Sequence, residues 1–188
     1  GPTCHYSMGG VRVNADTTAT TVPGLFAAGE VAAGLHGANR LGGNSLSDLL
    51  VFGRRAGLYA AEYVKSFSGS LNVNNAQAEA YANTMLAPFD SKGNENPYTI
   101  HADLQETMQN LVGIIRAESE LRQALEILDK LKQRTHKVKV EGNRHYHPGW
   151  HLALDLHSLL TFAEPATLAA IQRTESRGGH TRDHFPHT

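Results

Sequence analysis

The sequence has 188 residues, of which 40% are hydrophobic and 19% are charged, so it predicts a folded chain rather than a disordered one. Its formal net charge of −1 argues against a nucleic acid or an anionic membrane surface as the main partner. The one cysteine, Cys4, excludes an internal disulfide and favours a reducing compartment. No apolar run approaches the length of a membrane span.

The N-terminal part predicts short strands and turns. Val11 and Val13 alternate with polar neighbours, which is typical of a short strand, and residues 25–28 predict a second, apolar strand that ends before Glu30. In nucleotide-binding α/β folds, an acidic residue at a strand end is well placed to accept a hydrogen bond from a ribose or ribityl hydroxyl. The opening GPTCHYSMGG is dense in special residues, so we expect a piece of a longer protein.

Residues 36–48, HGANRLGGNSLSD, combine a cation, flexible glycines and the start of a helix. The guanidinium of Arg40 is a planar fork of donors that can bind a carboxylate at two points. A helix is expected over residues 44–66, and its N-terminus offers free N–H groups and a partial positive charge. Three polar residues are expected to cap this helix: Asn44, Ser45 and Ser47. On spacing alone, a Gly-rich loop that simply caps a helix is an equal alternative.

The remainder of the chain predicts helices. Residues 66–75 have the composition of a linker, residues 76–86 predict a helix, and residues 88–97 predict a loop. A polar loop is expected over residues 135–147, before a helix over 150–174 that Pro165 should kink or break. Between these segments, apolar residues at helical spacing predict two amphipathic helices whose stripes are core: Leu104, Met108, Leu111, Val112 and Ile115, then Leu121, Leu125, Leu128 and Leu131.

Histidine is unusually frequent, with 11 residues. One group comprises His145, His147 and His151, and a second comprises His180, His184 and His187. Histidine clusters can bind zinc. Neither group has a neighbouring cysteine, and Pro148-Gly149 divides the first between a loop and a helix, so no metal site is expected. Cys4 is expected to be a small buried hydrophobic residue rather than a reactive thiol.

Three motifs in this order and spacing, HYSMGG, GLFAAGE and HGANRLGGNSLSDLLVFGRRAG, closely resemble the flavoprotein subunit of succinate dehydrogenase and fumarate reductase. The resemblance continues through VGIIR, where residues 112–116 are expected on a helix, and reaches RTESRGGHTRD at residues 173–183. The segments PGWHLALDL and ESRGGHTRD are most similar to the actinobacterial succinate dehydrogenase type.

The resemblance implies the site residues. His5 and Arg40 are expected to hold a dicarboxylate, succinate or fumarate. Glu30 is expected to contact the ribityl chain of FAD, and Ser45 and Leu46 to face its isoalloxazine ring. The implied chemistry is hydride transfer between flavin and substrate, paired with proton transfer on the other carbon. No catalytic residue is expected here, because the family's proton-shuttling arginine lies in a capping domain that this sequence lacks.

The resemblance also implies an α+β architecture. Residues 1–66 are expected to be the C-terminal piece of an FAD-binding α/β domain and residues 67–75 a linker. An antiparallel helical bundle is expected over residues 76–174, followed by a charged tail, 175–188, that forms a salt-bridged surface turn. The sequence lacks the GxGxxG motif that binds the FAD pyrophosphate, so this chain alone is expected to be inactive and not to retain FAD.

In the intact enzyme the resemblance implies an iron–sulfur subunit, a membrane anchor and a quinone as electron acceptor, with the flavoprotein peripheral on the cytoplasmic face of the inner membrane. Two alternatives are open. L-Aspartate oxidase shares HGANR and a similar bundle, although Leu41-Gly42-Gly43 and Thr181-Arg182-Asp183 favour succinate dehydrogenase. The second alternative is a non-enzymatic helical interaction module that has kept a flavin-like loop.

Overall fold

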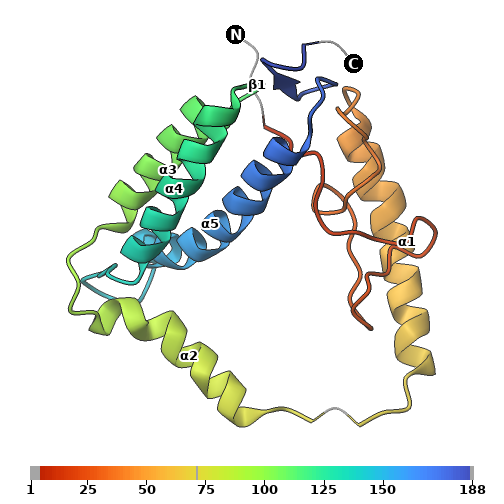
Figure 1. Ribbon diagram of the computed structural model, residues 1–188. Coiled ribbons are helices and arrows are strands. Elements are labelled where there is room, and N and C mark those ends of the chain that lie inside the picture. The colour runs from red at the N-terminus through yellow and green to blue at the C-terminus, as the bar shows by residue number, and fades with distance from the viewer. Residues whose placement is uncertain (1–4, 71, 187–188) are drawn as a thin grey trace. The chain divides into compact units, whose positions relative to one another are not determined.

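The computed structural model describes residues 5–70 and 72–186, and helices dominate it (Figure 1). The predicted α+β class, with a mostly helical second part, is confirmed. The chain divides into two compact units, Gly1–Leu71 and Asn72–Thr188. The predictions made for Cys4 and His187 fall outside the described residues.

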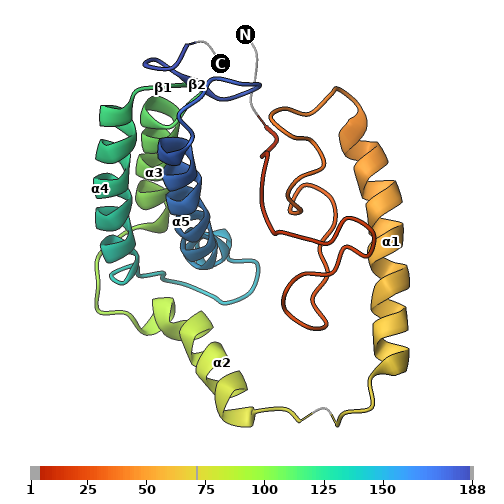
Figure 2. The ribbon, with the colours of Figure 1, turned by 45° about the vertical axis from the view of Figure 1, so that its right-hand side comes forward.

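The N-terminal unit consists of irregular chain beside one long helix, α1 (Asn44–Ser66), which has the predicted bounds (Figure 2). Before α1, Val11 pairs with Ala32 and Ala19 pairs with Phe26, each as an isolated bridge. The two short strands predicted around Val11 and over residues 25–28 are therefore wrong. Each segment forms a single bridge pair, and a strand needs consecutive pairs along its length to build a ladder.

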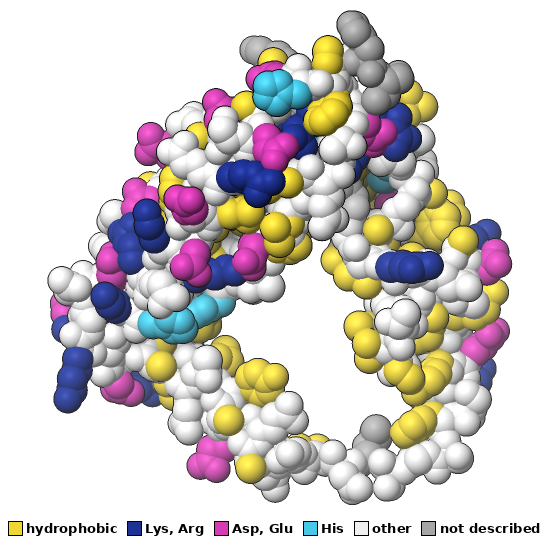
Figure 3. Space-filling model, viewed as in Figure 1, with side chains coloured by type: hydrophobic (Ala, Val, Ile, Leu, Met, Phe, Trp, Pro, Cys, Tyr) yellow, Lys and Arg dark blue, Asp and Glu magenta, His cyan; other side chains and the backbone are white. Residues whose placement is uncertain are grey.

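Helix α1 has an unusual distribution of buried side chains. Several of its large hydrophobic residues, among them Leu46, Leu50 and Val64, are more than half exposed, and hydrophobic side chains cover much of the surface of this unit (Figure 3). The residue of α1 that is buried is Asp48, with 4% of its surface exposed. A buried carboxylate requires polar partners, so Asp48 marks a polar cluster inside this unit.

The C-terminal unit contains α2 (Asn75–Asp90), α3 (Pro97–Leu111), α4 (Glu118–Thr135) and α5 (Pro148–Gln172). Helices α3, α4 and α5 pack against one another as a bundle (Figures 1 and 2). Helix α2 has no buried residue and is tied to α5 by the indole N–H of Trp150, which donates to the Met85 carbonyl at 2.7 Å. Ten buried residues form the main core: Ile100, Leu104, Leu128, Leu131, Val138, Val140, Ala153, Leu156, Leu160 and Ala163.

Two of these helices begin in the same way, with a side-chain cap followed by proline. The side chain of Asn96 accepts from the N–H of Tyr98 at 2.9 Å, and Pro97 opens α3. Nδ1 of His147 accepts from the N–H of Trp150 at 2.9 Å, and Pro148 opens α5. Proline is tolerated at the first helical position because its missing N–H has no partner there in any case.

The structure corrects three of the predicted helix bounds. Helix α2 runs through Pro88 to Asp90, where a loop was predicted. Helix α5 runs from Pro148 through Pro165 to Gln172 without the predicted break. Proline removes one intrahelical hydrogen bond, and the buried residues Ala163 and Thr167 on either side hold α5 in the core despite that loss.

The third correction concerns residues 112–116, which were predicted to be helical. Helix α3 ends at Leu111, and Ile115–Arg116 instead form strand β1, which pairs in parallel with β2 (Thr181–Arg182). Ile115 is 70% exposed, so its assignment to the core stripe is wrong, whereas Leu121, Leu128 and Leu131 of the second stripe are buried. The helical spacing of apolar residues extends beyond the end of α3 to Ile115. The strand partner of Ile115 is Thr181, which lies too far away in the sequence for this spacing to reveal it.

We expect Leu160→Ala to lower the free energy of unfolding by about 2–5 kcal/mol, because truncation of a buried leucine leaves a cavity. Leu160 is 2% exposed, and its neighbour Leu159 on the same helix is 39% exposed. Leu159→Ala is therefore the matched control and should cost less than about 1 kcal/mol. Urea denaturation of both variants measures the difference, and equal midpoints would show that this face of α5 is not core.

The end of the chain is tied to the bundle by a buried arginine, Arg182, whose side chain is 0% exposed. Its Nη1 donates to the carbonyls of Ala170, Ile171 and Arg173, at 2.7, 2.9 and 3.4 Å. Its Nη2 donates to Oε2 of Glu118, in the first turn of α4, at 3.2 Å. The last carbonyls of a helix lack intrahelical partners, so this guanidinium caps the C-terminus of α5.

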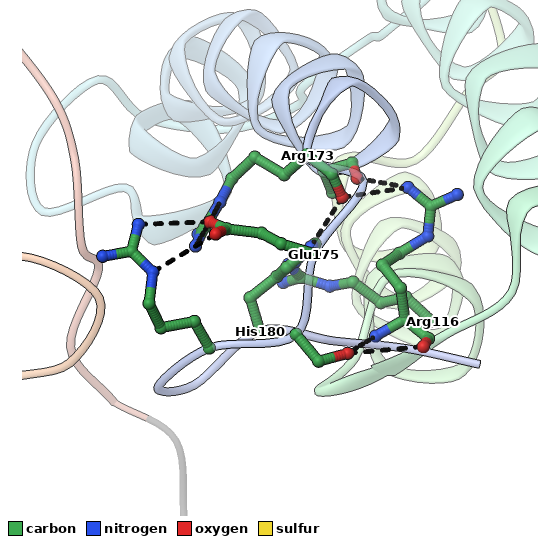
Figure 4. A network of polar contacts seen from close by, with 8 residues as sticks. Arg116, Arg173, Glu175 and His180 are labelled. Atoms are coloured by element: carbon green, nitrogen blue, oxygen red, sulfur yellow. Dashed lines mark hydrogen bonds and ion pairs between the residues drawn. The ribbon is translucent and has the colours of Figure 1, made fainter. Parts of the chain in front are cut away.

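A second arginine, Arg116, binds carbonyls directly after the C-terminus of α3 and also contacts His180 (Figure 4). Its Nε donates to the carbonyls of Val112 and Gly113, at 3.2 and 2.6 Å, and its Nη1 donates to Nδ1 of His180 at 2.6 Å. Because Nδ1 of His180 accepts, Nε2 carries the proton and donates to the Arg173 carbonyl at 3.1 Å. A neutral histidine thus connects the ends of the two helices.

The charged tail is therefore not the surface turn that was predicted. Glu175 does form ion pairs, with Arg173 at 2.5 Å and with Arg177 at 3.2 Å. His180 and Arg182, however, are buried. The sequence pattern of mixed charges is typical of a solvated turn, and it carries no signal that helix carbonyls and a distant strand would enclose these two side chains.

The stability of the chain should depend on the protonation of His180. Burial lowers the pKa of His180 below its ordinary value, and the guanidiniums of Arg116, Arg173 and Arg182 lower the pKa further. The unfolded chain then binds this proton more tightly, so the free energy of unfolding should fall as the pH falls from about 7 to about 5. His180→Gln should flatten this dependence, whereas the exposed His184→Gln should not. Identical pH profiles for the parent and His180→Gln would contradict this.

Candidate functional site

The predicted anion-binding residues His5 and Arg40 lie together in the N-terminal unit. Nη2 of Arg40 is 3.5 Å from Nε2 of His5, although 35 positions separate the two residues in the sequence. Arg40 follows Asn39, whose side-chain oxygen accepts from the Arg40 backbone N–H at 2.9 Å and fixes this turn of the loop. The chain thus gathers a guanidinium and an imidazole at one place.

The guanidinium of Arg40 has few strong partners within the protein. Its Nη1 lies 3.4 Å from the Leu41 carbonyl, near the limit of a hydrogen bond, and its Nε is buried with no partner among the described residues. None of the described aspartates and glutamates forms an ion pair with Arg40, whereas Arg134 binds both Glu95 and Asp103. Nη1 and Nη2 of Arg40, whose contacts are long, can therefore donate to an anion.

A polar cluster lies beside Arg40. The guanidinium carbon of Arg40 is 4.6 Å from the centroid of the Tyr6 ring, and the Tyr6 hydroxyl is 3.2 Å from Nε2 of His36. Oδ2 of the buried Asp48 is 3.3 Å from Nε2 of His36 and 3.5 Å from the Tyr6 hydroxyl. Burial raises the pKa of Tyr6, and the Asp48 carboxylate raises it further, so Tyr6 remains a neutral phenol.

The third predicted residue, Glu30, lies in a turn that packs closely on the segment after His5. Its Oε1 accepts from the backbone N–H of Ser7 at 2.8 Å. The turn comes so close that a Cβ added at Gly10 would lie 2.2 Å from the Val31 carbonyl oxygen, and Gly10 has a φ of +133°. Gly10 thus permits an approach of the two backbone segments that another residue would block.

Ser45 and Leu46 lie in the first turn of α1, as predicted, but the helix is capped differently. Its N-cap is Gly43, in the left-handed conformation with φ 84°, and no side chain bonds to the first amides. The predicted capping by Asn44, Ser45 and Ser47 is therefore wrong. Leu46 is 67% exposed, and apart from Gly43 and its two chain neighbours no described atom lies within 4 Å of a Cβ placed at Gly43. The N-terminus of α1 consequently stays open to a ligand.

The sequence matches known families at both ends. Residues 1–46 match the family described as FAD binding domain, and residues 101–188 match the family described as fumarate reductase flavoprotein C-term. The chain is 57% identical to a chain of the Mycobacterium smegmatis Sdh1 complex in the apo form, with a TM-score of 0.96, over 100% of this chain and 32% of that chain.

The chain belongs to the succinate dehydrogenase/fumarate reductase flavoprotein family. It is 39% identical to the succinate dehydrogenase flavoprotein subunit of Coxiella burnetii, over 96% of this chain and 33% of the relative. It is 38% identical to the fumarate reductase flavoprotein subunit of Mycobacterium tuberculosis, over 98% of this chain and 33% of the relative. The chain thus spans about a third of the length of these relatives. The resemblance inferred from the motifs, including its actinobacterial type, is confirmed.

Sequence reasoning assigned no role in this flavoprotein chain to Tyr6, His36 or Asp48. All three lie inside the motifs that carry the resemblance, HYSMGG and HGANRLGGNSLSD. The one available sequence signal is an acidic residue within a leucine-rich stretch, since Asp48 directly precedes Leu49 and Leu50. The direction of its side chain depends on contacts across 42 positions, which spacing does not reveal.

The histidine groups of the flavoprotein chain have structural contacts. Nε2 of His147 donates to the Glu141 carbonyl at 2.9 Å while Nδ1 caps α5, and His180 connects Arg116 to Arg173. Within residues 5–70 and 72–186, no group of three or more His, Cys, Asp or Glu side chains is arranged to hold a metal ion. Over the same residues, no helix combines the length and the apolar character that crossing a membrane requires.

Proposed function

We propose that this chain is part of an FAD-dependent oxidoreductase that interconverts succinate and fumarate. In this proposal residues 1–66 contribute to the flavin-binding domain, residues 67–75 link it to the rest, residues 76–174 form the helical domain and residues 175–188 are its tail. The observation that carries the proposal is the guanidinium of Arg40, which lies beside His5 and binds no described carboxylate of the protein. The membership of the family supports the same assignment.

The geometry suits one carboxylate of a dicarboxylate. A guanidinium can donate two parallel hydrogen bonds to a carboxylate, and these charge-assisted bonds are about twice as strong as neutral ones. His5, next to Arg40, adds an imidazole that can hydrogen-bond at the same place. Since succinate and fumarate both carry carboxylates at each end, the same two residues would hold either substrate.

The residues present also fit part of an FAD site. The N-terminus of α1 at Gly43, with Ser45 and Leu46 in its first turn, has no side-chain cap and carries a partial positive charge. Such a helix end would stabilise negative charge on a reduced isoalloxazine ring, and Glu30 lies on the turn that would meet the ribityl chain. When bound, FAD would accept or return the hydride.

Oxidation of succinate to fumarate removes a hydride from one methylene carbon and a proton from the other. We assign no proton acceptor to this chain, whose role would be to bind and orient the dicarboxylate through His5 and Arg40. In the intact enzyme we propose that electrons pass from FAD to an iron–sulfur subunit and then to a quinone. A membrane anchor beneath that subunit would hold the flavoprotein on the cytoplasmic face of the membrane.

The proposal is tested with the full-length protein that contains this chain, purified with its flavin. We expect it to oxidise succinate with a dye as electron acceptor and to reduce fumarate with a reduced dye as donor. Oxidation of L-aspartate without turnover of succinate would favour the L-aspartate oxidase alternative. A protein that turns over none of the three substrates would overturn the proposal and favour an interaction module.

A separate prediction concerns the chain of residues 1–188 alone, which we expect not to retain FAD. A dinucleotide needs both ends of its site, and this sequence contains no GxGxxG motif for the pyrophosphate. The chain is mixed with excess FAD and desalted, and its visible spectrum is recorded, with the full-length protein as a positive control. A flavin band that persists in the short chain at near one-to-one stoichiometry would refute this expectation.

A further inference from the structure

The residue beneath the Arg40 guanidinium, Tyr6, is fixed from two sides. The Arg40 guanidinium lies over its ring, with 4.6 Å between the guanidinium carbon and the ring centroid. Its hydroxyl contacts His36 at 3.2 Å and Asp48 at 3.5 Å. The Tyr6 and His36 rings also meet edge to face, with 5.4 Å between their centroids.

This anchoring connects three segments of the chain. Asp48 belongs to α1, His36 to the loop before it, and Tyr6 to the segment that carries His5. Because the carboxylate of Asp48 is buried, its contacts with His36 and Tyr6 satisfy a group that would otherwise be costly to bury. A regular helix thus provides the fixed point against which the Tyr6 ring is held.

Arg40 needs such support because its own contacts are weak. Its Nη1 and Nη2 lie 3.4 and 3.5 Å from their partners, so hydrogen bonds alone hold its long side chain loosely. An aromatic face attracts a guanidinium that lies over it and so limits the positions that the guanidinium takes. A guanidinium that keeps one orientation can meet a carboxylate with both donors without first losing side-chain freedom.

We propose that Tyr6, held by Asp48 and His36, is a positioning residue that orients Arg40 for the substrate carboxylate. This proposal rests on the proposed function, since it assumes that Arg40 binds a dicarboxylate. Tyr6 would act through Arg40 and would touch neither the reacting carbons nor the proton that is transferred. Its effect on turnover should therefore disappear when Arg40 is absent.

The test uses the flavin-loaded full-length enzyme and a double-mutant cycle of Tyr6→Leu with Arg40→Met. Loss of the ring should lower kcat/KM for succinate by about tenfold or more, since a displacement of about 1 Å can cost a hundredfold. In the Arg40→Met background, the same Tyr6→Leu change should lower kcat/KM by less than about twofold. Equal effects in the two backgrounds would indicate a structural role independent of Arg40 and would overturn the proposal.

Two further variants sharpen the result. Tyr6→Phe keeps the ring and loses the hydroxyl anchor, so its kcat/KM for succinate should lie between the values of the parent and of Tyr6→Leu. If Tyr6→Leu fails to retain flavin, the kcat/KM of Tyr6→Phe in the two backgrounds decides the test. Tyr63→Phe, in α1, is the control, because the Tyr63 ring packs on Phe26 and Phe67 away from Arg40. An active enzyme whose Tyr6 variants equal the parent overturns this inference alone, whereas a parent without succinate turnover overturns the proposed function as well.

Discussion

Arg182→Met is expected to lower the free energy of unfolding by about 3–5 kcal/mol, the range for removing one partner of a buried charge network. Methionine fills most of the space of the arginine stem but donates no hydrogen bond. The carbonyls of Ala170 and Ile171 at the end of α5 would lose their donor, and each buried group left unsatisfied costs about 1–3 kcal/mol. Urea denaturation of the chain measures the change.

The matched control is Arg122→Met. Arg122 binds the same carboxylate, that of Glu118, at 2.6 Å, but its side chain is 64% exposed. An exposed ion pair within one helix contributes less than about 1 kcal/mol, so Arg122→Met should leave the unfolding midpoint nearly unchanged. If the two substitutions cost the same, the importance of Arg182 would lie in its charge pair with Glu118 and not in the helix end that it caps.

Arg40→Lys is expected to reduce kcat/KM for succinate and fumarate by about a hundredfold in the flavin-loaded full-length enzyme, although the positive charge is kept. A lysine ammonium is a compact point charge and cannot reproduce the two parallel hydrogen bonds of a guanidinium. It would also lose the contact of the guanidinium with the Tyr6 ring. A substrate displaced by about 1 Å from its productive position can react a hundredfold more slowly. Steady-state kinetics with both substrates measures the loss.

Flavin content is the internal control for Arg40→Lys and should equal that of the parent, because Glu30, Ser45 and Leu46 are unchanged. Arg54→Lys, at an exposed position of α1, controls for the substitution itself and should behave as the parent. His5→Ala should impair the two substrates alike, because both present the same carboxylate. A value of kcat/KM within about twofold of the parent, less than roughly 0.5 kcal/mol of transition-state stabilisation, would mean that Arg40 does not hold the carboxylate.

The elements that the sequence predicted well are those that local pattern determines. Helix α1 has the predicted bounds because Gly43 marks its N-terminus and no proline interrupts the helix, although it contains Gly53 and Gly57. In α4, Leu121, Leu128 and Leu131 are buried as their spacing predicts. The family motifs also led to His5 and Arg40, which lie next to each other in the structure.

The features that the sequence did not reveal depend on contacts between distant residues. Strands β1 and β2 pair Ile115 with Thr181, and neither segment has the length or alternation of a strand by itself. The burial of Arg182 depends on carbonyls at the end of α5, which have no sequence signature. The cluster at Asp48 likewise joins Tyr6 from 42 positions away. In the last two cases a polar side chain satisfies polar groups of a distant segment, and composition alone does not reveal that segment.

The central claim is that Arg40 binds a carboxylate of the substrate, and direct titration tests it most simply. Malonate, a dicarboxylate that offers no pair of carbons to oxidise, is added to the flavin-loaded full-length parent and to its Arg40→Met variant while the flavin absorbance is followed. We predict saturable binding to the parent and a dissociation constant at least about tenfold higher for the variant, a loss of about 1.4 kcal/mol or more. Equal dissociation constants for the two proteins would contradict the account.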